Sequence, residues 1–411
     1  CYYRNIVGIN LNMKQGIHSK LLFIVLILLN GKLFASNEGM LDMLDSSQFH
    51  FHHWNGPNAS EDISKLIKEA RESYRPIVTS NCSIYIDQIE RDLLPFKNGI
   101  FRDSLDRSGE SGEIYKIIDH RLYRWKRCFF PARCSGVEHF LVKLVKDLPD
   151  MEFVLNTKDW PQVSKFRKSM PVFSFSKNPH HYLDILYPTW SFWEGGPAIS
   201  LYPTGLGRWD VMRDKLLLAA EKWPWENKLE IGFFRGSRTS EERDSIVLLS
   251  RERPDLVDAK YTKNQAWKSD ADTLYEPPAE EVGLENHCQY KYLFNYKGVA
   301  ASFRLRHLLF CGSLVYHSQD NWIEFFYLSL KPWIHYIPFS SKVNSDKLIS
   351  LLQYAKTHNA AMETIADEGF KFIQHHLRME DIICYWEQLL KKYSSLMRYT
   401  VTMEDGFHLI S

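Results

Sequence analysis

The sequence predicts an α/β protein of two lobes with a ligand cleft between them. Its 411 residues exceed the roughly 250 to 300 at which a single hydrophobic core stops growing, so two domains are expected. Short apolar runs alternate with helical patterns through the middle of the chain, which is typical of parallel sheets with crossover helices. Helical spacing then continues over 346–396. In such folds a ligand binds at the carboxyl ends of the strands.

The composition restricts the class of protein. With 45% hydrophobic and 25% charged residues, the chain has the balance of a globular protein with an ample core, which argues against disorder. The net charge of +1 gives no global field to attract nucleic acid or an acidic membrane. Any anion site must therefore be built locally, and no nucleic-acid partner is expected.

An apolar run, LLFIVLILL over 21–29, lies near the start of the chain. It is shorter than the roughly 20 residues that span a bilayer, but it fits the apolar region of a secretory signal with cleavage after Ala35. We expect a signal peptide over 13–35 that starts at Met13, with 1–12 as an upstream artefact and no stable membrane insertion after cleavage. The alternative is a signal anchor that stays attached.

Cysteine number and glycosylation sequons agree with entry into the secretory pathway. An even number of cysteines follows the signal, and in an oxidising compartment this favours three disulfides whose pairing is left open. The six are Cys82, Cys128, Cys134, Cys288, Cys311 and Cys384. Asn58 and Asn81 begin sequons for N-glycosylation, which matter only in that pathway.

The predicted elements follow one another along the chain. An entry helix over 60–74 has apolar residues at helical spacing, and a helix over 209–223 ends before Trp223-Pro224-Trp225, where we place the lobe boundary. The other elements of the middle region are strands at 153–155, 172–175, 231–234 and 313–315 and a helix around 246–251.

The segment FFRGSRTSEERD, over 233–244, begins as a strand and then turns polar. Its basic and hydroxyl side chains are expected at the carboxyl end of the strand, and they are Arg235, Ser237, Arg238 and Arg243. Guanidinium groups pair bidentately with diphosphate oxygens, and Gly236 allows close approach of the backbone. The alternative is a surface loop whose arginines pair with Glu241, Glu242 and Asp244.

A second segment, GVAASFR over 298–304, supplies small residues and then an arginine. If a helix starts near Ala300, its free N–H groups would face a phosphate, with Ser302 and Arg304 adding a hydroxyl and a charge. The alternative is a packed helix in which the alanines only allow close contact.

A carboxylate follows the strand at 153–156. Asp159 could face the cleft there and act as a general base, or it could be an ordinary turn residue before Trp160-Pro161. Asp270 and Asp272 resemble an acidic metal motif, but their surroundings look like a solvated loop. The sequence has no His/Cys cluster at zinc spacing and no Walker-type loop, so no metal site is predicted.

Several long motifs stand in one order along the chain. They are CFFPARCSGVEHF at 128–140, NTKDWPQV at 156–163, FWEGGPA at 192–198, YPTGLGRWD at 202–210, FFRGSRTSEERD at 233–244, YTKNQAWKS at 261–269 and YLFNYKGVAASFRLRHLLFCGSLV at 292–315. Over about 82–386 the sequence thereby resembles the Rumi-type protein O-glucosyltransferases, members of a KDEL-containing, capsule-type glycosyltransferase family. These enzymes glucosylate epidermal-growth-factor-like (EGF-like) repeats of Notch and related proteins.

The resemblance implies a glycosyltransferase-B fold of two Rossmann-like lobes and a helical C-terminal tail. The first lobe, 36–223, would hold the acceptor and the catalytic base, and the second, 224–375, would bind the UDP-sugar. A C-terminal helix over 376–411 would return to the first lobe. The donor would be UDP-glucose and, to a lesser degree, UDP-xylose, without a metal or other cofactor. Transfer would invert the anomeric centre, and the acceptor would be serine in the Cys-X-Ser-X-Pro/Ala-Cys pattern of a folded repeat.

The resemblance also assigns residues. Asp159 would be the catalytic base. The UDP-sugar positions would be Tyr202, Ser237, Arg243, Val299, Ala300, Ala301, Ser302, Phe303 and Arg304. The acceptor positions would be Phe129, Phe130, Pro131, Ala132, Arg133, Ala198, Ile199, Ser200, Leu201, Tyr202 and Pro203. The implied disulfides join Cys128 to Cys134, Cys288 to Cys311 and Cys82 to Cys384.

Two departures from the family accompany these assignments. A further cysteine pair of vertebrate relatives is replaced by Ile77 and Ile84, and the chain ends at 407–411 without a Lys-Asp-Glu-Leu-like retention signal. Residence in the endoplasmic reticulum lumen is expected nonetheless. The alternatives are a xylosyltransferase, a paralogue that modifies another serine, and a catalytically silent lectin-like or chaperone-like protein that binds such repeats.

Overall fold

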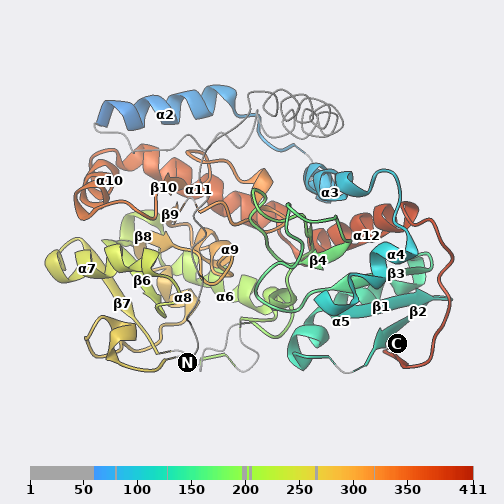
Figure 1. Ribbon diagram of the computed structural model, residues 1–411. Coiled ribbons are helices and arrows are strands. Elements are labelled where there is room, and N and C mark those ends of the chain that lie inside the picture. Colours follow the sequence, from blue (N-terminus) through green and yellow to red (C-terminus); the bar gives the residue numbers. More distant parts are fainter. Residues whose placement is uncertain are drawn as a thin grey trace, which may run out of the picture. The chain divides into compact units, whose positions relative to one another are not determined.

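The protein contains two β-sheets surrounded by helices, which confirms the α/β class (Figure 1). The computed structural model describes residues 60–78, 81–126, 128–196, 201–202, 206–263, 267–318 and 320–410. All of them belong to the unit 55–411. The predicted signal peptide and Asn58 lie outside the described residues. None of the described helices is both long enough and apolar enough to cross a membrane.

The second sheet in chain order is wholly parallel, and its strand order is β7-β6-β8-β9-β10. Its strands are β6 (Leu229–Gly236), β7 (Val257–Tyr261), β8 (Tyr290–Asn295), β9 (Leu314–Ser318) and β10 (Ile337–Phe339). The chain passes from β6 to β7 on one side and then to β8 on the other. The strand order therefore reverses between β6 and β8, and an open α/β sheet binds its ligand at such a reversal.

The first sheet is mixed, with the order β11-β2-β1-β3-β4-β5. Its strands are β1 (Glu113–Ile118), β2 (Arg121–Trp125), β3 (Met151–Leu155), β4 (Val172–Ser174), β5 (Ile185–Leu186) and β11 (Phe407–Leu409). Only β3, β4 and β5 run parallel in the Rossmann manner, whereas β1, β2 and β11 pair antiparallel. The two-residue turn between β1 and β2, Asp119-His120, has φ of 49° and 57°, as a twisted hairpin requires.

Helices cover both sheets. They are α2 (Ser60–Ser73), α3 (Ile86–Leu93), α4 (Arg102–Asp106), α5 (Pro131–Leu144), α6 (Trp209–Lys222), α7 (Asp244–Glu252), α8 (Leu284–His287), α9 (Leu305–Leu309), α10 (Ser345–Thr357), α11 (Asn359–His376) and α12 (Met379–Ser395). The expected helical tail over 346–396 is confirmed, and Figure 1 shows it running from beside the parallel sheet to the mixed sheet.

The end of the chain differs from the expectation of a C-terminal helix over 376–411. Helix α12 ends at Ser395, and β11 then adds to the edge of the first sheet. Packing against that edge stabilises the strand, because the ring of Phe407 contacts the ring of Trp125 and lies under the ammonium of Lys116. The return to the first lobe itself is present, since Tyr393 in α12 donates a hydrogen bond to the Glu152 carbonyl at 3.1 Å.

Three disulfides brace these elements, and they are the pairs that the resemblance implied. Cys82–Cys384 ties α12 to the start of the first lobe, Cys128–Cys134 closes a short loop before α5, and Cys288–Cys311 links the segments on either side of β8. Ile77 and Ile84, for which the resemblance implied the loss of a further cysteine pair, pack against the apolar core.

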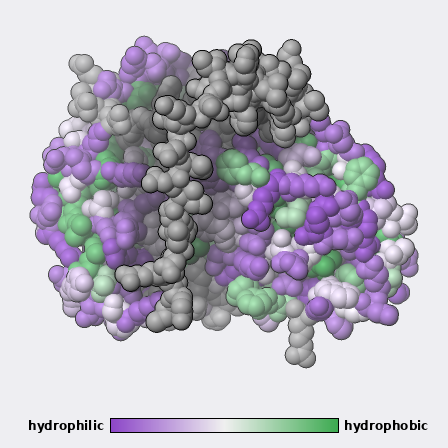
Figure 2. All heavy atoms as spheres, in the orientation of Figure 1, coloured by the Kyte–Doolittle hydropathy of each residue, from purple (hydrophilic) through white to green (hydrophobic). Residues whose placement is uncertain are grey.

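The two sheets are held together by direct contacts. A β-bridge pairs Lys177 with Ile323. The buried guanidinium of Arg306, in α9, donates to the carbonyl and hydroxyl oxygens of Ser191 at 3.0 and 2.9 Å and lies 4.0 Å from the centre of the Phe192 ring. One hydrophobic core includes residues of both sheets. The described surface in Figure 2 is mainly hydrophilic, with scattered apolar residues, as expected for a globular protein.

A buried lysine, Lys228, stabilises the segments that flank the parallel sheet. Lys228, just before β6, donates to the carbonyl oxygens of Cys288 and Cys311 at 2.6 and 2.9 Å, so one ammonium bridges both halves of a disulfide. Burial lowers the pKa of Lys228 to about 7, and the charge of Lys291 acts in the same direction.

The stability of the protein should therefore rise between pH 7 and pH 9. The pKa of Lys228 is lower in the folded state than the roughly 10.4 of an unfolded lysine, so unfolding takes up a proton in this range. Relative to Lys228→Met, which has no such group, the free energy of unfolding should increase by on the order of 1 to 2 kcal/mol from pH 7 to 9. Urea unfolding at each pH measures this, and parallel pH profiles of the two proteins would contradict it.

Candidate functional site

A cavity of about 410 Å³ lies where the carboxyl ends of strands from both sheets meet. From the first sheet, Asp159 follows β3, Phe175 follows β4 and Trp190 follows β5. From the second sheet, the loops after β6, β7 and β8 contribute Ser237, Thr262 and the run 298–304. The cavity thus includes the reversal point between β6 and β8, where a ligand is expected.

Most of the predicted donor residues line this cavity, and so do Asp159 and Arg133. The donor residues found there are Ser237, Arg243, Val299, Ala300, Ala301, Ser302, Phe303 and Arg304. Tyr202 is not among the lining residues. Its hydroxyl donates to Glu285 Oε2 and accepts from the Leu284 amide, both at 2.6 Å. Leu284 lines the cavity. Tyr202 therefore lies behind a lining residue and does not itself face the cavity.

The other predicted acceptor residues are only partly described. Phe129 is 74% exposed and packs edge-on against Phe130, and Pro131, Ala132 and Leu201 are exposed as well. Ala198, Ile199, Ser200 and Pro203 lie outside the described residues.

The predicted glycosylation site Asn81 is exposed, and its side chain accepts a hydrogen bond from the amide of Ser83.

Two of the four side chains expected to cluster after β6 are occupied by acidic partners. Arg235 donates twice to the carboxylate of Asp258, at 2.8 and 2.7 Å, and Arg238 donates twice to Asp244, at 2.8 and 2.6 Å. The alternative of paired surface arginines is therefore correct for Arg238, and Arg235 pairs with an aspartate of β7 that the sequence did not suggest.

Arg243 is different, because it bonds only to backbone carbonyls among the described residues. It is buried and donates to the carbonyl of Ser237 at 2.6 Å and to that of Lys297 at 2.6 and 3.0 Å. These bonds join the loop after β6 to the loop after β8. Burial lowers the pKa of Arg243 to about 10, which leaves the group charged at neutral pH.

Arg304 is a second buried cation beside it. Its Nη1 donates to the Arg235 carbonyl, and its Nη2 has no hydrogen-bond partner among the described residues. Burial lowers the pKa of Arg304 to about 9, and the nearby charge of Arg243 adds to the effect. Within the described part of the chain no carboxylate forms an ion pair with either guanidinium. Two adjacent buried cations that form no ion pair favour an anion.

A glycine provides the space between these groups. A Cβ atom on Gly236 would lie 2.9 Å from Arg304 Nη1 and 3.6 Å from Arg243 Nη1. Any side chain at this position would displace the Arg304 guanidinium or occupy the space that an anion needs. This is the close approach for which a glycine in the first segment was expected.

The expected helix near Ala300 is absent, and α9 instead begins at Leu305. Residues 298–304 form an irregular turn in which the Gly298 amide donates to the Ala300 carbonyl at 2.9 Å. The turn arises because Ala300 and Ala301 pack into the core while Val299 stays exposed. Neither the phosphate-binding helix end nor the packed helix that the sequence left open is therefore present at 298–304, although the same residues do line the cavity.

Asp159 is placed by a turn that Asn156 organises. The Asn156 side chain donates to the Trp160 carbonyl at 2.8 Å and accepts from the Lys158 amide at 2.9 Å. The Asp159 side chain is 44% exposed, and its Oδ1 lies 3.0 Å from Nη2 of Arg133. A carboxylate of the first sheet thus faces the same cavity as the buried cations of the second.

Some cavity residues were not foreseen from the sequence. Phe175 could have been found, because it ends the predicted strand at 172–175, but Trp190 and His287 carry no local signal. His287 Nδ1 lies 2.9 Å from the Gly283 carbonyl, so it holds the proton. Burial lowers the pKa of His287 to about 4, which leaves His287 uncharged at neutral pH.

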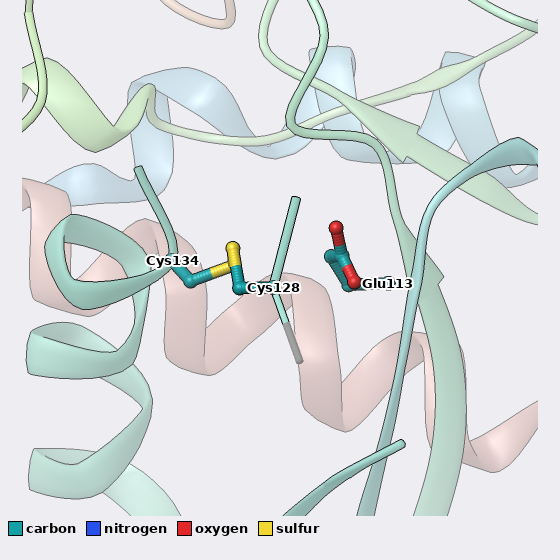
Figure 3. Close-up of side chains that lie close together, drawn as sticks. All are labelled: Glu113, Cys128 and Cys134. Carbon is teal, nitrogen blue, oxygen red and sulfur yellow. A yellow bond between two sulfur atoms is a disulfide. The ribbon is translucent and has the colours of Figure 1, made fainter. Parts of the chain in front are cut away.

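One cluster of metal-ligand residue types occurs among the described residues, formed by Glu113, Cys128 and Cys134 (Figure 3). The two cysteines are joined in a disulfide and offer no thiolate. Glu113 instead accepts a hydrogen bond from the Phe129 amide at 3.0 Å.

The acidic motif at Asp270 and Asp272 has a structural role. Asp272 accepts a hydrogen bond from the Lys268 amide at 2.7 Å and caps a short helical turn.

Comparison with known proteins gives consistent matches. The sequence profile of glycosyl transferase family 90 matches residues 78–411. An O-glucosyltransferase rumi homolog of Aedes aegypti is 56% identical, over 83% of this chain and 85% of that protein. Protein O-glucosyltransferase 1 of Homo sapiens is 52% identical, over 84% and 88%. O-glucosyltransferase rumi of Drosophila melanogaster is 49% identical, over 94% and 96%.

Removal of the charge at Arg243 and at Arg304 should change the stability of the protein in opposite directions. Arg304→Met is expected to raise the free energy of unfolding of the free protein by about 1 kcal/mol, because it removes a desolvated cation that makes one backbone hydrogen bond. Arg243→Met should lower it, because several carbonyls lose their donor. Urea unfolding measures both variants, and equal destabilisation by the two would contradict this view of Arg304.

Proposed function

The chain belongs to glycosyl transferase family 90, and from this premise we propose that it is an inverting protein O-glucosyltransferase. Its donor is UDP-glucose and, to a lesser degree, UDP-xylose. Its acceptor is serine in the Cys-X-Ser-X-Pro/Ala-Cys pattern of folded EGF-like repeats, such as those of Notch-type proteins. The relatives named O-glucosyltransferase, which match most of the chain, support this choice.

One observation carries the proposal. A single cavity contains a carboxylate from one sheet, Asp159, and two buried guanidinium groups from the other, on Arg243 and Arg304. A sugar nucleotide has the complementary chemistry, because its diphosphate needs cations and its anomeric carbon needs an activated hydroxyl nearby. A binding protein would need the cations but would have no use for the base.

The roles then follow from the chemistry of transfer. Asp159 accepts the proton of the acceptor serine as the serine oxygen attacks the anomeric carbon. The bond from that carbon to the diphosphate oxygen breaks in the same displacement, so the α-linked donor gives a β-linked glucose. Arg243 and Arg304 stabilise the negative charge that grows on departing UDP. Ser237 and the turn 298–304 hold the donor against the second sheet.

The place of action is the second part of the proposal. Three disulfides link the six cysteines at 82–384, which suits an oxidising compartment. Folded, disulfide-bonded EGF-like repeats are found in that same compartment. We assign the protein to the lumen of the endoplasmic reticulum, where it meets its acceptor before secretion.

Replacing the base should abolish transfer but spare donor binding. Asp159→Asn is expected to lower kcat for transfer to a folded EGF-like repeat by about 100- to 10,000-fold, because an amide cannot take the serine proton. The affinity for UDP, measured by calorimetry, should stay within about threefold, because the residues proposed to bind the diphosphate are unchanged. Mass spectrometry of the repeat measures the product.

Two results would count against this assignment. Wild-type turnover by Asp159→Asn would remove Asp159 as the base. Failure of the wild-type protein to modify any folded repeat with either UDP-sugar, despite binding both, would favour the alternative of a catalytically silent, lectin-like or chaperone-like protein. Mapping of the modified serine would separate this enzyme from a paralogue that uses another position.

Transfer is expected to persist in excess EDTA. The guanidinium groups of Arg243 and Arg304 already supply positive charge for the leaving diphosphate, which is the usual task of a divalent cation. The initial rate of glucose transfer with and without EDTA checks this. Loss of activity that returns on addition of Mn²⁺ or Mg²⁺ would show that the arginines are not sufficient.

A further inference from the structure

We infer that Arg133 is a positioning residue that orients the carboxylate of Asp159 for proton transfer. The inference rests on the proposed function and goes beyond an acceptor contact by Arg133. Arg133 Nη2 lies 3.0 Å from Asp159 Oδ1, and Arg133 Nη1 donates to the Thr157 carbonyl at 2.6 Å. The guanidinium of Arg133 thus contacts the turn that carries the base at two positions, the Asp159 carboxylate and the Thr157 carbonyl.

The two oxygens of Asp159 are therefore not equivalent. Oδ1 is the oxygen nearest to Arg133 Nη2, at 3.0 Å, whereas Oδ2 accepts no hydrogen bond among the described residues. The side chain is 44% exposed and lines the cavity, so a free carboxylate could rotate among several rotamers. Fixing Oδ1 leaves Oδ2 as the oxygen that meets the serine proton. The proton passes to Oδ2 while Arg133 stays charged and is not consumed.

Arg133 is itself held rigidly by aromatic rings. Its guanidinium carbon lies 4.4 Å from the centre of the Phe130 ring and 4.5 Å from that of the Trp190 ring. Cation–π contacts with two rings limit the rotamers of the side chain and keep its planar fork in one orientation. Trp190 also lines the cavity, so the wall next to the base and the group that orients it form one packed unit.

The backbone at Arg133 is fixed as well. Cys134, the next residue, is bonded to Cys128, and the loop that this disulfide closes is pinned where Glu113 accepts from the Phe129 amide (Figure 3). On the other side, Gly195 has φ of 75°, and a Cβ there would lie 2.8 Å from the Ala132 carbonyl carbon. The segment around Gly195 therefore packs directly on the start of α5.

This arrangement predicts a split between kcat and KM. Arg133→Met keeps an unbranched apolar side chain between the two rings but loses the charge, the ion pair with Asp159 and the hydrogen bond to Thr157. It is expected to lower kcat for transfer to a folded EGF-like repeat by about 10- to 100-fold, since a misplaced base costs this much. KM for the repeat and for UDP-glucose should stay within about threefold. Arg133→Lys keeps the charge with a single donor head and should recover part of kcat.

A matched control contacts the same helix from a neighbouring strand. Arg124, in β2, bonds to Glu138 of α5 and does not line the cavity. Arg124→Met removes an arginine–carboxylate pair against α5 and should leave kcat unchanged. Thermal unfolding and UDP calorimetry on every variant check that each one folds and binds donor.

The outcomes separate this inference from the proposed function. An unchanged kcat in Arg133→Met, with or without a higher KM for the repeat, would overturn the positioning role and leave Asp159 as the base. If Arg133→Met does not fold, Arg133→Lys decides: a several-fold lower kcat at unchanged KM supports the role, and a wild-type kcat overturns it. A wild-type protein without transfer activity would refute the proposed function instead.

Discussion

Two guanidinium groups, on Arg243 and Arg304, are buried next to each other, and neither forms an ion pair with a carboxylate among the described residues. Burying two like charges costs free energy, so contacts with the surrounding structure must offset this cost. Arg243 is held by carbonyls of two loops, and Gly236 leaves the space beside both groups. The reversal of strand order between β6 and β8 brings those two loops together. This arrangement suits the diphosphate that we propose as the ligand of the parallel sheet.

The first lobe supplies the other half of the chemistry, and its position relative to the cations is fixed by several contacts. Arg306 donates to Ser191, Lys177 pairs with Ile323, and α12 is tied to the first lobe by Cys82–Cys384. Asp159 therefore lines the same cavity as the cations. Arg133 contacts this carboxylate, so the groups that we propose for binding, orientation and proton transfer are neighbours in one cavity.

Much of this could be predicted, for physical reasons that differ by element. The parallel strands and the tail helices have clear periodicity, and long motifs indicated Asp159, Ser237 and Arg243. The β1–β2 hairpin was missed because its turn is Asp119-His120 rather than the usual pair with glycine. Strand β11 depends on the partner strand β2, and the pairing of Arg133 with Asp159 joins positions 26 residues apart. Single-sequence periodicity contains neither kind of long-range contact.

We propose that the buried arginine pair, Arg243 and Arg304, recognises a diphosphate. Isothermal titration of the wild-type protein with UDP and with UMP tests it most directly, because the two ligands share the base, the ribose and one phosphate. UDP should bind at least about 10- to 100-fold more tightly, as expected when a second phosphate meets preformed charge-assisted hydrogen bonds. Equal affinities for UDP and UMP would contradict the account.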